Sequence, residues 1–404
     1  MQRRELSVAV GRTFAIIALF ATFTASSRAG VATETVLYNF GHGGDGHNPH
    51  GSLVFDTQGN LFGTTYGGGS GYGTVFELTP NGAGGWQETQ IHRFNGQDGI
   101  GPIGNLIFDA AGNLYGTVTQ FGPKGKGAVF ELTPTGSGTW RESILHAFAG
   151  GSDGAGPVGG LVFDSAGNLY GVTMEGGVSN LGTVFELSPS GSAWREKILH
   201  SFDGTDGGFA FAGPAMDSQG NLYGTTSGEN TGGGYGSVFE LTPTSSGAWQ
   251  VSRLHIFIGL DGAQPYSTPT LDGAGNVYVT TNAGGTLGWG NVVKLTPISG
   301  GWNETAIYSF TGGADGAGPF AGVTMDASGN LYGTTQIAGG GSGTVFRLTR
   351  SAAGTWGLTM LFRFDGVDGG QSSGGVILDS QGNLYGTATT GGTSRFGVVF
   401  EITP

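Results

Sequence analysis

The sequence predicts an all-β fold, a seven-bladed β-propeller with four antiparallel strands in each blade, and three observations support it. The pentapeptide Asp-x-x-Gly-Asn recurs seven times at intervals of 53 to 55 residues. Each interval contains four short stretches in which apolar and polar residues alternate between clusters of Gly, Pro, Asn and Asp, which is typical of strands. The two ends of the array complement each other, as the closure of a ring requires. The copies of the pentapeptide begin at Asp56, Asp109, Asp164, Asp217, Asp272, Asp326 and Asp379.

Glycine and proline are abundant, with 85 and 14 residues among 404, and such a content also occurs in disordered chains. The 26 Phe, 12 Tyr and 7 Trp are too many large apolar side chains for a chain that buries no core. We therefore expect the glycines in turns at fixed intervals.

The third repeat shows the four strands of one unit. They are expected over residues 160–164, 168–173, 182–188 and 194–202, and no stretch of useful length has a helical period. Four strands in about 54 residues are typical of a propeller blade. We expect the first strand to line the central channel, the second to follow through the Asp-x-x-Gly-Asn turn, and the fourth to be outermost.

The ends of the array predict how the ring closes. Residues 33–40 align with the fourth strand of another unit, residues 141–148, whereas the last unit stops after its third strand, residues 397–403. Blade seven is therefore expected to combine residues 374–404 with 33–40, so that residues 30–404 form a single propeller whose N-terminal strand completes the last blade.

The first 29 residues differ from the repeats and are typical of a signal peptide. Arg3, Arg4 and Arg12 precede an apolar stretch at residues 14–23, and small residues lead to an expected cleavage site at Ala29. The protein is thus predicted to be secreted, extracellular or periplasmic, or associated with the cell envelope. No later segment is apolar for long enough to span a membrane, so no span is expected after cleavage.

Charge and cysteine content exclude several classes of function. The chain has 16 Lys and Arg against 29 Asp and Glu, a formal net charge of −13, and this disfavours binding to nucleic acid. It has no cysteine, which excludes disulfides, thiolate metal sites and thiol nucleophiles.

Several linked motifs recur in register, namely Gly-Asn-Leu-Tyr-Gly-Thr at 112–117, Gly-Thr-Val-Phe-Glu-Leu-Thr-Pro at 73–80 and Leu-His-x-Phe at 199–202. These motifs resemble the GloVer tandem repeat of secreted bacterial proteins, and the resemblance covers residues 33–404. It implies an exported repeat protein without an assigned biochemical role. It supplies no catalytic residues.

Repetition separates structural residues from candidate functional ones. Each unit has one Asp in the pentapeptide and another 11 residues earlier in an Asp-Gly loop, and both are expected to form turns. His92, His146, His200 and His255 share a slot in which other units have Tyr or Phe, so we expect these rings to pack against the blade. Function, if it is local, is expected where the units differ.

The first such difference is a set of aromatic residues on the face that carries the loops between blades, here called the top face. Aromatic rings beside polar loops suit stacking on sugars or on apolar groups, so a carbohydrate or another envelope component is the predicted ligand. The alternative is that these rings fill the channel or pack the loops. The candidate ligand-binding residues are Tyr72, Phe211, Tyr235, Tyr266, Trp289, Phe320 and Phe396.

The second difference is the loop that enters blade one, which carries His42, Asp45, His47 and His50. Imidazoles with a carboxylate suit a divalent transition metal, although their spacing matches no recognised metal motif. The alternative is a glycine-rich loop with unliganded histidines. No other cofactor is predicted.

The sequence thus predicts a monomeric binding or scaffold module with no assigned catalytic residue, and a non-enzyme is favoured. Two alternatives remain open. One is a metal-assisted polysaccharide lyase or hydrolase that uses the histidine loop, and the other is a purely structural repeat protein.

Overall fold

The computed structural model describes residues 32–404 apart from 43, 83, 137, 229–233 and 339–340. The predicted signal peptide, residues 1–29, lies outside the described residues. Residues Ala32–Pro404 form one compact unit. Within its described part the one helical element is a 3₁₀ turn, η1 (Gly151–Asp153), so the all-β prediction is confirmed.

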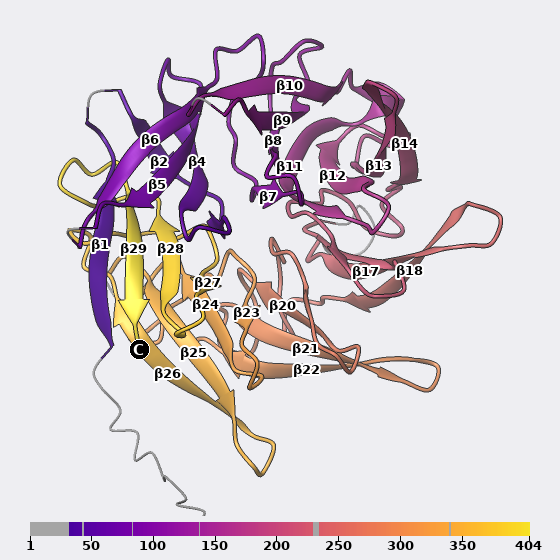
Figure 1. The fold of residues 1–404 in the computed structure, drawn as a ribbon. Helices are drawn as coiled ribbons and strands as arrows, with labels where there is room; N and C mark the ends of the chain where they lie inside the picture. The colour runs from indigo at the N-terminus through magenta and orange to yellow at the C-terminus, as the bar shows by residue number, and fades with distance from the viewer. Residues whose placement is uncertain (1–31, 43, 83, 137, 229–233, 339–340) are drawn as a thin grey trace, which may run out of the picture. The chain divides into compact units, whose positions relative to one another are not determined.

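Seven antiparallel sheets make up this unit, and each is one blade of a propeller (Figure 1). The innermost strands are mostly two residues long: β3 (Val54–Phe55), β7 (Ile107–Phe108), β11 (Ala155–Phe163), β15 (Ala215–Met216), β19 (Thr270–Leu271), β23 (Thr324–Met325) and β27 (Ile377–Leu378). The second strands are β4 (Leu61–Gly68), β8 (Leu114–Val118), β12 (Leu169–Glu175), β16 (Leu222–Thr226), β20 (Val277–Thr281), β24 (Leu331–Thr335) and β28 (Leu384–Ala388).

The outer half of each blade has longer strands. The third strands are β5 (Thr74–Pro80), β9 (Ala128–Pro134), β13 (Thr183–Ser190), β17 (Ser237–Pro243), β21 (Asn291–Ile298), β25 (Thr344–Arg350) and β29 (Val398–Thr403). The fourth are β6 (Trp86–Arg93), β10 (Trp140–Ala147), β14 (Ala193–Ser201), β18 (Trp249–Ile256), β22 (Gly301–Ser309), β26 (Trp356–Arg363) and β1 (Thr33–Asn39). Blade one has an additional strand, β2 (Gly46–Pro49), which pairs with β4 and which the sequence analysis did not predict.

The ring closes as predicted. The N-terminal strand β1 pairs with β29 in an antiparallel register that runs from Thr33 opposite Thr403 to Asn39 opposite Val398. The seventh sheet therefore has the order β1-β29-β28-β27, with both ends of the described chain in one blade (Figure 1).

The core lies between neighbouring blades. A Phe from the third strand of one blade packs against the Phe that ends the fourth strand of the preceding blade, as Phe76 does with Phe40 at a ring separation of 5.1 Å. The residue opposite Phe76 on the second strand is Gly63, where a Cβ atom would lie 2.5 Å from the phenyl ring. The glycine of the Leu-Tyr-Gly-Thr motif is thus required because the phenyl ring that covers it leaves no space for a side chain.

Hydrogen bonds from the second strand to the next blade add polar contacts around the centre. The hydroxyl of Thr225 donates to the carbonyl of Ser267 at 2.9 Å, and that of Thr280 donates to Ala321 at 2.9 Å. Thr387 in blade seven donates to Gly51 in blade one at 3.2 Å, so the same contact continues across the closure of the ring.

The Asp-x-x-Gly-Asn turns are built as expected from their residue types. In the first copy, one oxygen of Asp56 accepts the backbone N–H groups of Gln58 and Asn60, and the other accepts the side-chain amide of Asn60 at 2.7 Å. The same three bonds recur in all seven copies. Both carboxylate oxygens of each aspartate thus accept hydrogen bonds within the turn.

Candidate functional site

A cavity of about 410 Å³ lies at the centre of the ring and is lined by residues from all seven blades. It lies where the chain passes from the top loop of each blade into the innermost strand. Six of its lining residues stand at equivalent positions, four residues before the innermost strand of their unit, where the sequence varies from blade to blade. They are His50, Ile103, Phe211, Tyr266, Phe320 and Ser373.

A left-handed backbone conformation turns the chain into the cavity. Two positions before each of these six residues, the backbone has a positive φ. Two of the positive-φ residues are glycines, and the other four, with φ between 52° and 57°, are Asn48, Phe209, Gln264 and Gln371. Non-glycine residues rarely adopt this conformation, because it costs free energy. The turn is therefore held by the surrounding structure, and such strained positions are often found near functional sites.

One side of the cavity is an almost continuous aromatic wall. Phe211 contacts Tyr266 at a ring separation of 5.0 Å, and Tyr266 contacts Phe320 at 5.1 Å. His50 extends the wall with an edge-on contact to Phe320 at 6.0 Å. Burial lowers the pKa of His50, so that the imidazole is neutral at neutral pH and resembles the other rings.

The rest of the lining consists mainly of small and polar residues. A Cβ atom on Gly104 would lie 2.0 Å from the carbonyl oxygen of Gly159, so neighbouring backbones touch here and no side chain fits between them. The side chain of Asn105 accepts the backbone N–H of Ser52 at 2.7 Å, and the hydroxyl of Ser373 lies 3.2 Å from the amide nitrogen of Gln336. The lining of the cavity thus combines aromatic rings with small and polar residues.

The other four predicted ligand-binding residues lie elsewhere. Tyr72, Tyr235, Trp289 and Phe396 are 38% to 48% exposed and do not line the central cavity. Each ring covers a glycine of the following inter-blade loop, as Trp289 covers Gly312, where a Cβ atom would lie 2.6 Å from the indole. The structure brings Phe211, Tyr266 and Phe320 together and keeps these four apart, in an outer ring of loop contacts.

The histidine loop of blade one places its four side chains in different surroundings. Asp45 accepts the backbone N–H of Gly41 at 2.9 Å and the hydroxyl of Tyr38 at 2.8 Å, which is the turn role expected of every Asp-Gly loop. His47 packs against Phe396 at 5.4 Å, His50 lines the cavity, and His42 is exposed. Metal binding by this loop, and an enzyme that would depend on it, stay predictions.

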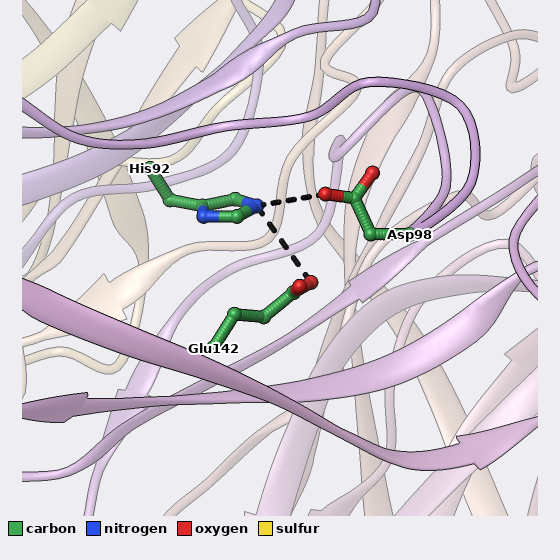
Figure 2. Close-up of side chains that lie close together, drawn as sticks. All are labelled: His92, Asp98 and Glu142. Atoms are coloured by element: carbon green, nitrogen blue, oxygen red, sulfur yellow. Dashed lines mark hydrogen bonds and ion pairs between the residues drawn. The ribbon is translucent and has the colours of Figure 1, made fainter.

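A polar cluster between blades was missed by the sequence analysis. His92 packs its ring on Phe94 as expected, but its Nε2 atom lies 3.2 Å from Asp98, the aspartate of the next Asp-Gly loop (Figure 2). The same pairing joins His146 to Asp153 at 3.0 Å. It also joins His200 to Asp206 at 2.6 Å and His255 to Asp261 at 2.9 Å. The sequence contained a signal for this pairing, because in four units a histidine is followed by an aspartate six or seven residues later.

A glutamate of the next blade faces several of these pairs. Burial, with a further contribution from a nearby aspartate, raises the pKa of Glu142 to about 7, and the pKa of Glu196 is raised to about 7 for the same reasons. Burial also lowers the pKa of His92 and of His146, which favours neutral imidazoles. Each of the clusters at His92 and His146 thus contains two carboxyl groups beside a neutral imidazole.

Comparisons with solved structures show the fold. The chain is similar to the extracellular domain of a proposed one-component system from B. thetaiotaomicron, with a TM-score of 0.55, 10% identity, and 91% of this chain and 39% of that chain covered. It is also similar to a proposed 6-phosphogluconolactonase from Bacteroides uniformis, with a TM-score of 0.52, 13% identity, and 78% and 85% covered.

A third similar structure is PorZ, a bacterial surface component of the type-IX secretion system of Porphyromonas gingivalis. Its TM-score is 0.50 at 15% identity, with 91% of this chain and 47% of that chain covered. The chain therefore spans less than half the length of two of these three proteins. No protein of curated function matches the sequence. Among the described residues, no helix is long and apolar enough to cross a membrane.

The sequence itself assigns the family. The model of the Gloeobacter/Verrucomicrobia repeat matches residues 21–235 and 212–404, which together cover almost the whole chain. The two matches together include every blade. The chain belongs to the Gloeobacter/Verrucomicrobia repeat family, as the resemblance to the GloVer repeat predicted.

Proposed function

We propose that the chain is a binding module, secreted or associated with the cell envelope, and that it binds a carbohydrate or another envelope component in the central cavity. The observation that supports this proposal is the aromatic wall of Phe211, Tyr266 and Phe320, which lines one cavity together with small and polar residues. The wall occurs where the repeats differ in sequence, so the repeat architecture alone does not require it.

The chemistry of the cavity suits a sugar. The C–H groups of a pyranose ring stack on aromatic faces, while its hydroxyls need hydrogen-bonding groups such as those of Asn105 and Ser373. A volume of about 410 Å³ lies within the usual range for small-molecule sites, so we expect one or two sugar units to be held. An exported location is supported by the predicted signal peptide, and two of the similar structures are an extracellular domain and a surface component.

A glycan array followed by titration calorimetry tests this proposal. Tyr266→Ala and Phe320→Ala should each weaken the binding of an identified glycan about tenfold or more, because each removes a stacking surface, while the melting temperature changes little. Trp289→Ala, in the outer ring of loops, should leave the affinity unchanged and serves as the matched control.

Two outcomes would contradict the proposal. If Trp289→Ala weakens binding and Tyr266→Ala does not, the ligand lies between the outer loops. If the array shows no binding, and if the cavity variants only lower the melting temperature, the aromatic wall is a structural plug and the purely structural alternative is favoured.

A further inference from the structure

We propose that the top side of the propeller contains two sites for a divalent transition-metal ion, one between blades one and two and one between blades two and three. The ligands of the first are His92, Asp98 and Glu142, and those of the second are His146, Asp153 and Glu196. The sites are independent of the central cavity and of the histidine loop at His42–His50. From the sequence alone, their histidines are expected only to pack against the blade.

The distances between ligand atoms carry this inference. Nε2 of His92 lies 3.2 Å from Oδ2 of Asp98 and 3.6 Å from Oε1 of Glu142 (Figure 2). A tetrahedral ion held by nitrogen and oxygen ligands at about 2.0–2.2 Å separates neighbouring ligand atoms by about 3.3–3.6 Å. In both clusters the three ligand atoms lie within 4.8 Å of one another, so a small movement of the side chains would bring all three around one cation.

A buried oxygen in each cluster has no other partner. Oε1 of Glu142 and Oε1 of Glu196 are enclosed and accept no hydrogen bond from the described residues, as is also true of the equivalent atoms of Glu34, Glu88 and Glu304. A buried polar atom without a partner is costly, and a cation would satisfy it. The side chains of His92 and Glu142 are still 17% and 18% exposed, which leaves a path from solvent to the ligands.

The surroundings of Asp98 suit a metal ligand. Asn95 donates its backbone N–H to Oδ1 at 2.9 Å and its side-chain amide to Oδ2 at 3.1 Å, and this fixes the carboxylate orientation. Each carboxylate oxygen has two lone pairs, so Oδ2 can accept the amide and bind an ion. With one imidazole and two carboxylates, we expect Zn²⁺ or a similar transition-metal ion, because an imidazole nitrogen is a poor ligand for Mg²⁺ or Ca²⁺.

The third interface supplies an internal control. His200 pairs with Asp206 as the other histidines do, but Val251 occupies the place of the glutamate on the next blade. This interface has two of the three ligands and should not bind the ion with comparable affinity. In the blade-six unit the histidine slot holds Phe362, which indicates that a His→Phe change is compatible with the blade.

Titration of the purified, metal-free chain with Zn²⁺ tests the proposal. The wild-type protein should bind two equivalents, one for each cluster. Glu142→Gln and His92→Phe should each abolish one of them, Glu196→Gln should abolish the other, and His200→Phe should abolish neither. Excess Mg²⁺ or Ca²⁺ should not displace the bound Zn²⁺.

Thermal unfolding gives a second measurement. Because the ligands of each site come from two blades, Zn²⁺ should raise the melting temperature of the wild-type protein and not that of the Glu142→Gln/Glu196→Gln double variant. The proposal is overturned if the wild-type protein binds no Zn²⁺, or if the double variant binds as much as the wild type. The glutamate would then instead share a proton with the neighbouring aspartate.

Discussion

At the scale of single residues, the same slot in the repeat gives different chemistry according to its neighbours. The aspartate of the Asp-Gly loop accepts a bond from a tyrosine at two interfaces, as from Tyr38, and pairs with a histidine such as His92 at four others, while at the remaining interface the slot holds Phe362. Glu34 lies at that last interface, where no imidazole is present. Glu34 therefore shows how a buried carboxyl group affects stability when no histidine lies beside it.

Glu34 should make the stability of the protein depend on pH. Burial, and then the charges of Asp368 and Asp365, raise its pKa to about 7, whereas a glutamate in an unfolded chain titrates near about 4.3. The folded state thus binds this proton more tightly. The resulting stabilisation is fully present below about pH 4.3, declines as the pH rises, and is lost above about pH 7.

The variant Glu34→Gln isolates this effect, since it keeps the shape of the side chain and removes its charge. Its melting temperature should exceed that of the wild type at pH 8, and the difference should vanish at pH 4. Glu175→Gln, at an exposed residue at the end of β12, should change nothing at either pH. A Glu34→Gln variant that is less stable than the wild type at pH 8 would show that the ionised carboxylate has a favourable partner.

At the scale of strands, the packing of each blade depends on a pair of residues that face each other on the second and third strands. Six blades pair a glycine with a buried phenylalanine, as Gly116 pairs with Phe130. Blade five instead pairs Val279 with Val293. The two kinds of residue pair fill similar space, because in blade five the larger residue on the second strand compensates for the smaller residue on the third.

This compensation predicts a double-mutant rescue. Gly116→Val alone should destabilise the protein by about 1–3 kcal/mol or more, since a Cβ atom there would lie 2.6 Å from the ring of Phe130. Phe130→Val alone should leave a cavity and also destabilise. The double variant, which copies blade five, should be more stable than the sum of the single changes predicts. Additive effects in urea unfolding would contradict the proposed compensation.

Much of this arrangement could be predicted from the sequence, and the limits have physical causes. Strand order followed from repetition, because each unit folds into the same four-stranded sheet, and ring closure followed from the complementary ends of the array. The pairing of His92 with Asp98 and Glu142 was not foreseen, since Glu142 comes from the neighbouring blade and only the packing of two blades brings it close. Trp289 was grouped with Tyr266 because both are aromatic and on top loops, although they lie at different distances from the centre of the ring.

At the scale of the whole ring, closure depends on one strand that is remote in sequence from its partner. β1 covers the outer edge of β29, with six residue pairs in register, and Phe40 at its end is fully buried. The other six blades are each made from a continuous segment, and their outer two strands are joined by a short hairpin. The ring can therefore open at blade seven by separation of β1 from β29, whereas in every other blade the two outer strands are held together by a hairpin.

Two variants should separate the presence of this strand from its place in the sequence. A chain that begins at residue 41 leaves β29 as an unpaired edge and removes Phe40, so we expect a lower melting temperature and association through the exposed edge. A circular permutant that joins Pro404 to Ala32 through a short glycine-containing turn, with new termini next to Gly41, restores the same pairing as an ordinary hairpin. Thr33 already lies opposite Thr403, so the connection is short. We expect the permutant to be monomeric by size-exclusion chromatography and as stable as the wild type. A truncated chain that matches the wild type in melting temperature and size would show that β1 is not needed to close the ring.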